Sequence, residues 1–153
     1  MTALRPLAID LDALGDTRAL WDDWLESTRT VLGVDPAALS ADRGAAAEEL
    51  DRHGAGNWRT LLARYGEDRA PVYLRRDAET SAALRALAAS GRAIGVFTDA
   101  PDQLARIALA QAGAERRASA LETGSGALDR LLAVLGAEAV VVRSRAELLE
   151  LTA

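Results

Sequence analysis

Hydrophobic residues in this chain form short continuous runs that alternate with longer stretches of helical periodicity. Four runs have the length of a buried strand, namely residues 7–11, 93–97, 117–122 and 139–142, of which the third is the weakest. In the stretches between them apolar residues recur every three or four positions, as in residues 16–32. This alternation predicts an α/β fold with a three-layer parallel sheet and right-handed crossovers.

Polar residues and glycines mark where the predicted helices begin and end. Asp16 or Thr17 begins the first helix and Gly33 ends it, and Asp77 begins a helix that continues to Ser90. Later helices are expected to begin at Pro101, at Ser125 and at the S-x-x-E pair Ser144 and Glu147, which is typical of a capping box.

Residues 34–76 interrupt this regular order. They break into short helical pieces, one opened by Asp35-Pro36, one over residues 44–52 and one over residues 57–65 that Gly66 closes. The first crossover is therefore far longer than the roughly 30 residues of one βαβ unit. We expect a core of residues 1–33 and 77–153, with residues 34–76 inserted as a small helical cap over the carboxyl ends of the strands, where open sheets bind ligands.

The amino-acid composition excludes several classes of site and partner for this chain. The 153 residues suit one domain, with a net charge of −5 and no basic cluster, which argues against nucleic acid or an anionic membrane as partner. The chain has no cysteine, no lysine and a single histidine, which excludes disulfides, thiolate or His-cluster metal sites and Schiff-base chemistry. No apolar run approaches 18 residues and no signal-peptide pattern precedes the first strand, so we expect a cytoplasmic protein.

Two acids follow the first predicted strand. Asp10 and Asp12 are separated by one residue, so both can face one crevice at the carboxyl edge of the sheet. One carboxylate there could attack a phosphoryl group while the other protonates the leaving group and later activates water. Mg²⁺ commonly lies between two such acids. Alone, the D-x-D pattern is a weak signal, because it more often marks a pair of surface acids at a strand-to-loop junction.

The context of these acids resembles a known family. Residues 7–17, LAIDLDALGDT, are similar to the first motif of the haloacid dehalogenase-like (HAD) superfamily, and residues 94–98, IGVFT, look like its second motif. The resemblance covers almost the whole chain in order and spacing, and the family carries a helical cap between these motifs. It implies that Asp10 is a nucleophile, that Asp12 is an acid/base and that Thr98 binds the transferring phosphoryl oxygens.

The later motifs of the family are degenerate in this chain. Where the family carries a lysine after the third strand, residues 122–126 read ETGSG, and where it carries Gly-Asp after the fourth strand, Arg143 and Ser144 stand. Glu147 is the nearest acid, and Leu14 replaces the usual Thr or Val. We therefore expect Mg²⁺, for which Asp10 and Asp12 are the candidate ligands, to bind weakly or not at all.

Arg143 has more than one interpretation. If the fourth strand lies beside the first, its guanidinium could lie near Asp10, where it would replace a metal ion or bind phosphate in a fork. It could instead point into solvent, with Ser144 and Glu147 merely capping the last helix.

Other side chains favour structural roles. Trp21, Trp24 and Trp58 are expected in the core rather than in a substrate pocket, and His53 is expected to cap a short helix. Asp99 is expected to cap the helix after Thr98, and the alternative is that it faces the pocket.

These observations favour a HAD-like phosphohydrolase that acts on a small phosphorylated molecule through an aspartyl-phosphate, and we expect its activity to be reduced. The alternative is a catalytically silent HAD-like protein that serves as a binding or protein-interaction module. Haloacid dehalogenation ranks last, because no halide pocket is evident. A homodimer joined at an unpaired edge strand is also compatible with the sequence, and so is a protein partner.

Overall fold

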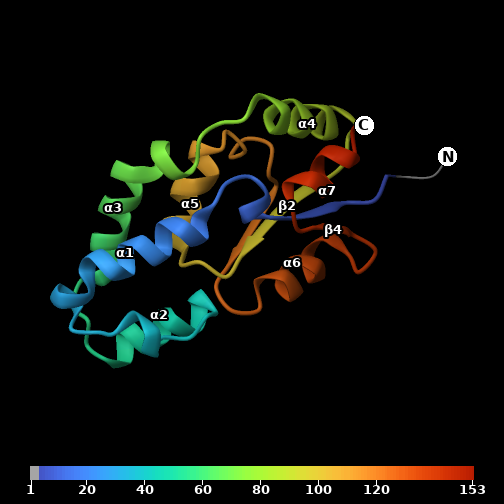
Figure 1. The fold of residues 1–153 in the computed structure, drawn as a ribbon. Helices are drawn as coiled ribbons and strands as arrows, with labels where there is room; N and C mark the ends of the chain where they lie inside the picture. The colour runs from blue at the N-terminus through green and yellow to red at the C-terminus, as the bar shows by residue number, and fades with distance from the viewer. Residues whose placement is uncertain (1–3) are drawn as a thin grey trace.

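The computed structural model describes residues 4–153 and shows an α/β fold (Figure 1). Within this range there are four strands, seven α-helices and two single 3₁₀ turns, at Leu11–Ala13 and Pro36–Ala38. In chain order the elements are β1 (Leu7–Asp10), α1 (Thr17–Leu32), α2 (Arg43–Arg52), α3 (Trp58–Tyr73), α4 (Ala78–Ala89), β2 (Ile94–Thr98), α5 (Asp102–Gln111), β3 (Ala120–Thr123), α6 (Ala127–Leu135), β4 (Val140–Val142) and α7 (Arg145–Glu150).

The four strands form one all-parallel sheet in the order β3-β2-β1-β4. Asp10 at the end of β1 is paired in register with Phe97 of β2, so Thr98 follows directly beside it. The predicted parallel sheet is confirmed, and each strand lies within three residues of its predicted limits. The fourth strand lies beside the first, which satisfies the condition for placing Arg143 near Asp10.

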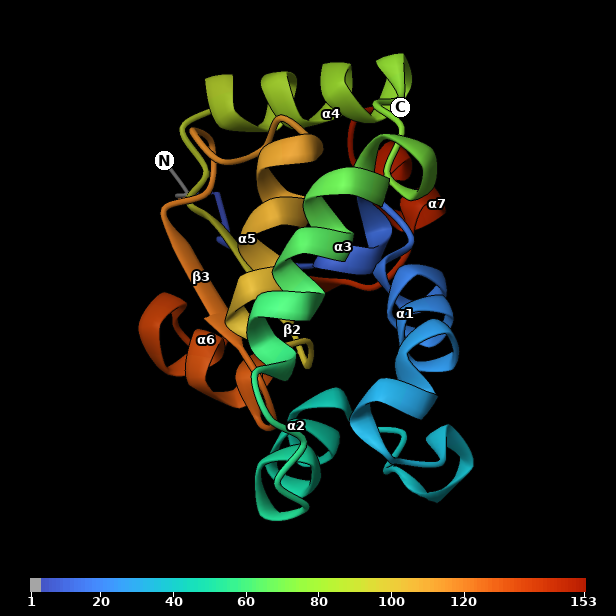
Figure 2. The same cartoon turned by 90° about the vertical axis from the view of Figure 1, so that its left-hand side faces the viewer.

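Helices cover both faces of the sheet, which is compatible with three layers. On one face Ala8 and Phe97 pack against α6. Gly95 lets α6 pack closely there, because a Cβ at this position would lie 2.6 Å from Cδ1 of Leu131 and that side chain would have to shift. Side chains alternate between the two faces along each strand, so the neighbouring strand residues point to the other face. There the main core contains Leu7, Ile9, Ile94 and Val96, and α1, α3 and α5 contribute to it (Figure 2).

Local capping signals predicted most of the helix starts. The side chains of Asp16, Asp77 and Ser144 each accept a backbone hydrogen bond from the first turn that follows them. The expectation for Ser125 is wrong. Gly126 holds the N-cap position of α6 without a side-chain bond, and the hydroxyl of Ser125 donates to Asp42 instead.

The third piece of the inserted segment is longer than predicted. Instead of ending before Gly66, α3 continues through it to Tyr73. The reason is packing: a Cβ on Gly66 would lie 3.2 Å from Cδ1 of Ile107, so this glycine brings α3 close to α5 rather than ending the helix. The piece opened by Asp35-Pro36 is only a 3₁₀ turn.

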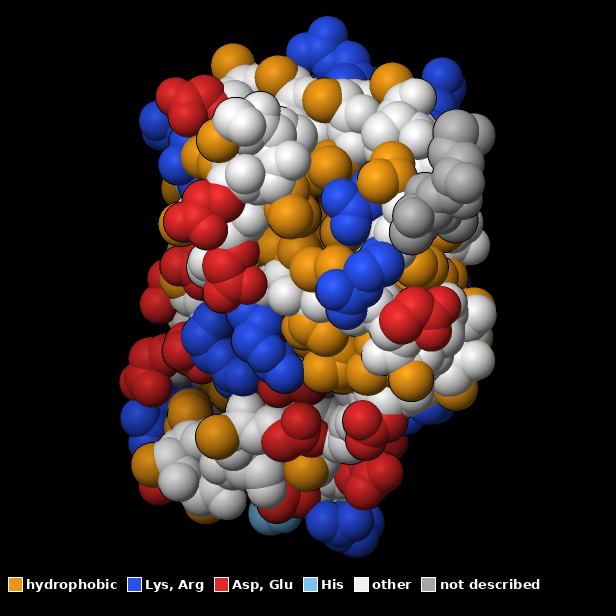
Figure 3. All heavy atoms as spheres, turned by 90° about the vertical axis from the view of Figure 1, so that its right-hand side faces the viewer, with side chains coloured by type: hydrophobic (Ala, Val, Ile, Leu, Met, Phe, Trp, Pro, Cys, Tyr) orange, Lys and Arg blue, Asp and Glu red, His pale blue; other side chains and the backbone are white. Residues whose placement is uncertain are grey.

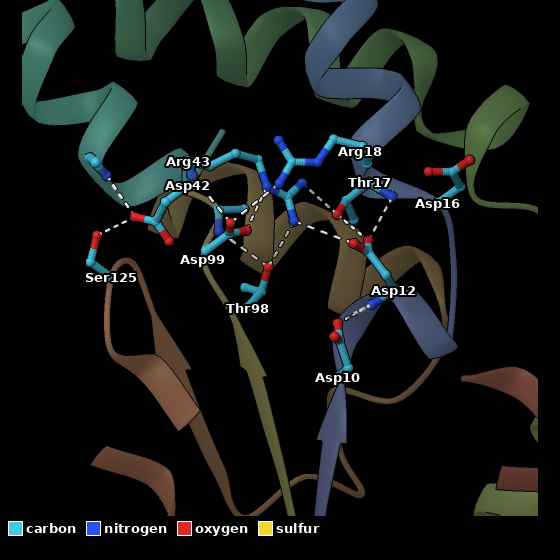
Figure 4. Close-up of polar contacts among 12 residues, drawn as sticks. Asp10, Asp12, Asp16, Thr17, Arg18, Asp42, Arg43, Thr98, Asp99 and Ser125 are labelled. Atoms are coloured by element: carbon cyan, nitrogen blue, oxygen red, sulfur yellow. Dashed lines mark hydrogen bonds and ion pairs between the residues drawn. The ribbon is translucent and has the colours of Figure 1, made fainter. Parts of the chain in front are cut away.

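The two helices of residues 34–76 have different surroundings. Helix α3 packs against α1 and α5, and its Leu62 and Ala70 belong to the main core. Helix α2 lies at the opposite end of the molecule from α4 and begins beside the carboxyl ends of the strands (Figures 2 and 4). The division into a core and a separate cap stays a prediction, and α2 is the element that covers the strand ends.

The three tryptophans lie in the core, as predicted. Trp21, Trp24 and Trp58 are at most 1% exposed, with ring centroids 5.3 Å apart for the first pair and 6.1 Å for the second. His53 is the C-cap of α2, and its Nε2 lies 3.2 Å from the carbonyl oxygen of Gly33.

Strand β4 is an edge of the sheet and lies on the side of the molecule shown in Figure 3. Hydrophobic side chains gather in the middle of this side, between arginine and acidic side chains (Figure 3). Self-association at this edge stays a prediction. Among residues 4–153, no helix is both long enough and apolar enough to cross a bilayer.

Candidate functional site

Asp10 stands at the tip of β1 and is held there by the turn that follows. It is the N-cap of the 3₁₀ turn Leu11–Ala13, and its Oδ1 accepts a hydrogen bond of 2.9 Å from the backbone N–H of Asp12. Its Oδ2 makes no hydrogen bond with any residue of the range 4–153. One oxygen is thus anchored by the backbone, and the other is not engaged by any of the described residues.

Burial raises the pKa of Asp10 above its ordinary value. The negative charge of Asp12 adds to this effect, whereas the hydrogen bond from Asp12 N–H and the charges of Arg43 and Arg143 oppose it. Asp10 is therefore a partly desolvated carboxylate, with cations close enough to influence it.

Asp12 is fixed from both sides. Its Oδ1 accepts hydrogen bonds from the backbone N–H of Thr17, at 3.0 Å, and from the Thr17 hydroxyl. Its Oδ2 lies 3.4 Å from Nη2 of Arg43. The start of α1 and a residue of α2 therefore hold this carboxylate together.

Arg43, in the first turn of α2, is the centre of the polar network in Figure 4. Its side chain is only 2% exposed. Nε donates to Oδ1 of Asp99 at 2.7 Å, Nη1 donates to the Thr17 hydroxyl at 2.8 Å, and Nη2 lies 3.3 Å from the Thr98 hydroxyl. Its backbone N–H also donates to Asp99, at 3.2 Å. A buried guanidinium thus joins groups from α1, α2 and the end of β2.

Sequence reasoning did not single out Arg43. One signal was present: the N-terminal end of a helix dipole disfavours a cation, so an arginine directly after the N-cap Asp42 needs acidic partners elsewhere in the fold. Those partners follow β1 and β2 and could not be paired with it by spacing alone.

The start of α2 is docked on the loop between β3 and α6. Oδ2 of Asp42 accepts hydrogen bonds from the Ala45 N–H, at 2.9 Å, and from the Ser125 hydroxyl. Gly44 touches the same loop so closely that a Cβ would lie 2.2 Å from the backbone nitrogen of Ser125. These contacts fix the position from which Arg43 reaches the strand ends.

Thr98, at the end of β2, is buried, with 2% of its surface exposed. Its Oγ1 accepts hydrogen bonds from the Ala100 N–H, at 3.2 Å, and from Arg43. Because both contacts use the oxygen as acceptor, the hydroxyl hydrogen remains free to be donated to an anion.

Asp99 faces the site rather than capping the next helix, which was the less favoured of its two interpretations. Besides Arg43, it accepts a bond of 3.3 Å from Nη2 of Arg18. The N-cap of α5 is Pro101, without a side-chain bond.

A cleft of about 450 Å³, called here the strand-end cleft, brings together the predicted site residues Asp10, Asp12, Thr98 and Arg143. The remaining lining residues are Arg18, Arg43, Phe97, Asp99, Gly124, Gly126, Ala127, Leu128 and Asp129. The cleft therefore holds four carboxylates and three guanidinium groups.

Arg143 is exposed and lines this cleft. Its guanidinium carbon is 5.8 Å from the centre of the Phe97 ring, and its backbone N–H donates to Glu147 at 3.0 Å. It makes no ion pair within residues 4–153, but it lies close enough to Asp10 to lower that group's pKa. Arg143 is thus near Asp10, as one interpretation required, without closing on it.

The residues present are a poor fit for Mg²⁺, because of the two candidate ligands only Asp10 has an oxygen without a hydrogen bond among residues 4–153, its Oδ2. Both oxygens of Asp12 are already engaged by Thr17 and Arg43, and Arg143, which follows the fourth strand, adds a positive charge to the lining of the same cleft. Within the described range, no group of three or more His, Cys, Asp or Glu side chains could hold a metal ion.

No protein-family model matches the chain, and no curated protein matches it significantly.

Proposed function

We propose that the chain is a HAD-like phosphohydrolase that acts on a small phosphate ester through an aspartyl-phosphate on Asp10. The observation that carries the proposal is the free Oδ2 of Asp10, in the same cleft as the Thr98 hydroxyl and the arginines. A carboxylate beside groups that bind an oxyanion is the arrangement that in-line phosphoryl transfer needs.

The steps use this chain's own residues. The Thr98 hydroxyl and Arg143 bind oxygens of the phosphate while Oδ2 of Asp10 attacks phosphorus and the bond to the leaving alcohol oxygen breaks. Water then attacks the aspartyl-phosphate and releases phosphate and the Asp10 carboxylate. Asp12 gives a proton to the leaving oxygen in the first step and takes one from water in the second.

Reduced activity is part of this proposal. Because Thr17 and Arg43 engage both oxygens of Asp12, proton transfer by Asp12 requires one of these contacts to be released. The same observation favours the second candidate, a catalytically silent HAD-like protein that binds an anion or a partner protein in this cleft.

The ligand and the compartment belong to the proposal as well. The net charge of −5 argues against nucleic acid or an anionic membrane surface as ligand, so we propose a small phosphorylated molecule that binds in the strand-end cleft. The cytoplasm is the compartment that we propose.

A panel of phosphate monoesters tests the hydrolase proposal, with the wild-type protein and Asp10→Asn assayed in Mg²⁺ and in EDTA. We expect slow phosphate release by the wild type and a loss of at least about 100-fold in Asp10→Asn. Asp22→Asn makes the same chemical change on the exposed side of α1 and serves as the control. Equal turnover by Asp10→Asn would refute the mechanism, and no turnover across the panel would favour the silent protein.

A further inference from the structure

The most deeply buried charge near the strand ends is a cation that the protein itself supplies. Arg43 is 2% exposed, and its guanidinium lies between Asp12 and Asp99, two acids that follow the ends of β1 and β2 (Figure 4). We propose that Arg43 takes the place of a divalent metal ion, so that the strand-end cleft binds phosphate-type oxyanions without one. The anion part of this inference rests on the proposed phosphohydrolase function, whereas the metal part does not depend on turnover.

The acids at the strand ends leave a divalent ion few free oxygens. Mg²⁺ or Mn²⁺ needs carboxylate oxygens at short distances in near-octahedral geometry. Asp10 offers one unengaged oxygen, its Oδ2. Asp12 offers none, and Asp99 accepts three hydrogen bonds from Arg43 and Arg18. A divalent ion would have to displace the guanidinium, or bind beside it against its positive charge.

Arg43 also makes the strand-end cleft more favourable for a phosphate-type anion. By compensating Asp12 and Asp99, Arg43 reduces the repulsion that these acids would exert on a phosphate. Its bond to Oγ1 of Thr98 also occupies an acceptor position of that hydroxyl, which leaves the hydrogen for an incoming oxygen. Arg143, exposed at the mouth, then adds a cation that an anion can reach.

The docking of α2 determines the position of the Arg43 guanidinium. Arg43 reaches the acids only because α2 is docked through Asp42, Ser125 and the close approach at Gly44. A methyl group at residue 44 would collide with the backbone of the β3–α6 loop and push the start of α2 away. Gly44→Ala therefore displaces the guanidinium while leaving the charge of the chain unchanged.

The experiment titrates the full chain with Mn²⁺, followed by electron paramagnetic resonance of the free ion, and with inorganic phosphate, followed by calorimetry in EDTA and in Mg²⁺. We expect the wild type to bind phosphate with the same affinity in both buffers, within about twofold, and to bind Mn²⁺ only weakly. Arg43→Gln should strengthen Mn²⁺ binding by about tenfold or more, because it leaves the acids uncompensated, and should weaken phosphate binding in EDTA by about tenfold.

Two further variants make the test specific. Gly44→Ala should change both affinities in the same directions as Arg43→Gln, because it moves the cation. Arg52→Gln, which removes a charge from the exposed end of the same helix, should match the wild type in both titrations. If Arg43→Gln does not fold, as judged by circular dichroism, the wild type and Gly44→Ala carry the test.

The proposal is overturned if wild-type phosphate binding requires Mg²⁺, if the wild type binds Mn²⁺ tightly, or if displacing Arg43 changes neither affinity. Its failure is distinct from failure of the hydrolase proposal. A protein without any turnover can still pass both titrations, and an Asp10-dependent phosphatase can still fail them.

Discussion

Nε of Arg43 donates a hydrogen bond of 2.7 Å to Oδ1 of Asp99, which joins the first turn of α2 to the residue directly after β2. This bond joins the segment of residues 34–76 to the carboxyl ends of the strands, where Asp10 and Thr98 lie. The cleft therefore includes a contact between distant parts of the chain, and its strength can be measured.

Asp99→Asn should destabilise the protein by about 2 kcal/mol, because it removes the charge that faces a buried guanidinium. Urea denaturation followed by circular dichroism measures the change in the free energy of unfolding. Asp102→Asn, which alters a largely exposed pair with Arg106, should cost less than about 0.5 kcal/mol. Equal losses in the two variants would show that the Arg43–Asp99 bond contributes nothing special.

The Thr98 hydroxyl is expected to bind the anion directly. Thr98→Val keeps the shape of the side chain but removes the donor, so it should weaken inorganic phosphate binding by about tenfold. Thr98→Ser keeps the donor and should stay within about threefold of the wild type. Calorimetric titration with phosphate distinguishes these outcomes, and equal affinities in all three proteins would remove Thr98 from the site.

Two buried tryptophans differ in one respect that stability can report. Nε1 of Trp24 has no hydrogen-bond partner among residues 4–153, whereas Nε1 of Trp58 donates to Asp51 at 2.9 Å. Replacement by Phe removes a similar volume at each position, but only Trp58→Phe also loses a hydrogen bond. Trp24→Phe should therefore cost less, by about 1 kcal/mol, in urea denaturation followed by circular dichroism. The reverse order would mean that packing dominates.

The lowered pKa of Asp77 should make the stability of the fold depend on pH. The hydrogen bond from Arg145, at 2.6 Å, lowers the pKa of Asp77 well below its usual range, and a bond from Thr80 acts in the same direction. A lowered pKa in the folded state stabilises the fold at pH values above the unfolded-state pKa, and this stabilisation is lost as the pH falls through the folded-state value.

Arg145→Gln should therefore lower the melting temperature at neutral pH, and its difference from the wild type should shrink below about pH 4. Arg85→Gln, an equal charge change on the exposed side of α4, is the control and should show little effect at either pH. A difference between Arg145→Gln and the wild type that is the same at every pH would contradict the role of Asp77.

The sequence predicted those parts of the fold that depend on local signals. The apolar runs located the strands, and Asp16, Asp77 and Ser144 located helix starts, because a cap acts within its own first turn. Gly66 misled the prediction, since a glycine that ends a helix and one that admits a neighbouring helix look the same in sequence.

The site residues, too, were predicted only where neighbouring strand ends place them together, and not where distant parts of the chain pack against each other. Asp10, Asp12 and Thr98 were placed together because parallel strands end at one edge of the sheet, and the structure brings them to one cleft. Arg43 was missed, because its partners Asp12 and Asp99 are 31 and 56 positions away and only the docking of α2 brings them together.

The most direct test of the account is a search for the covalent intermediate. The protein is mixed with acetyl phosphate, quenched in acid and analysed by mass spectrometry of its peptides. We expect one added phosphoryl group on the peptide that contains Asp10, and none on that peptide in Asp10→Asn. A phosphoryl group at another residue, or none on the wild-type protein while it hydrolyses a phosphate ester, would contradict the account.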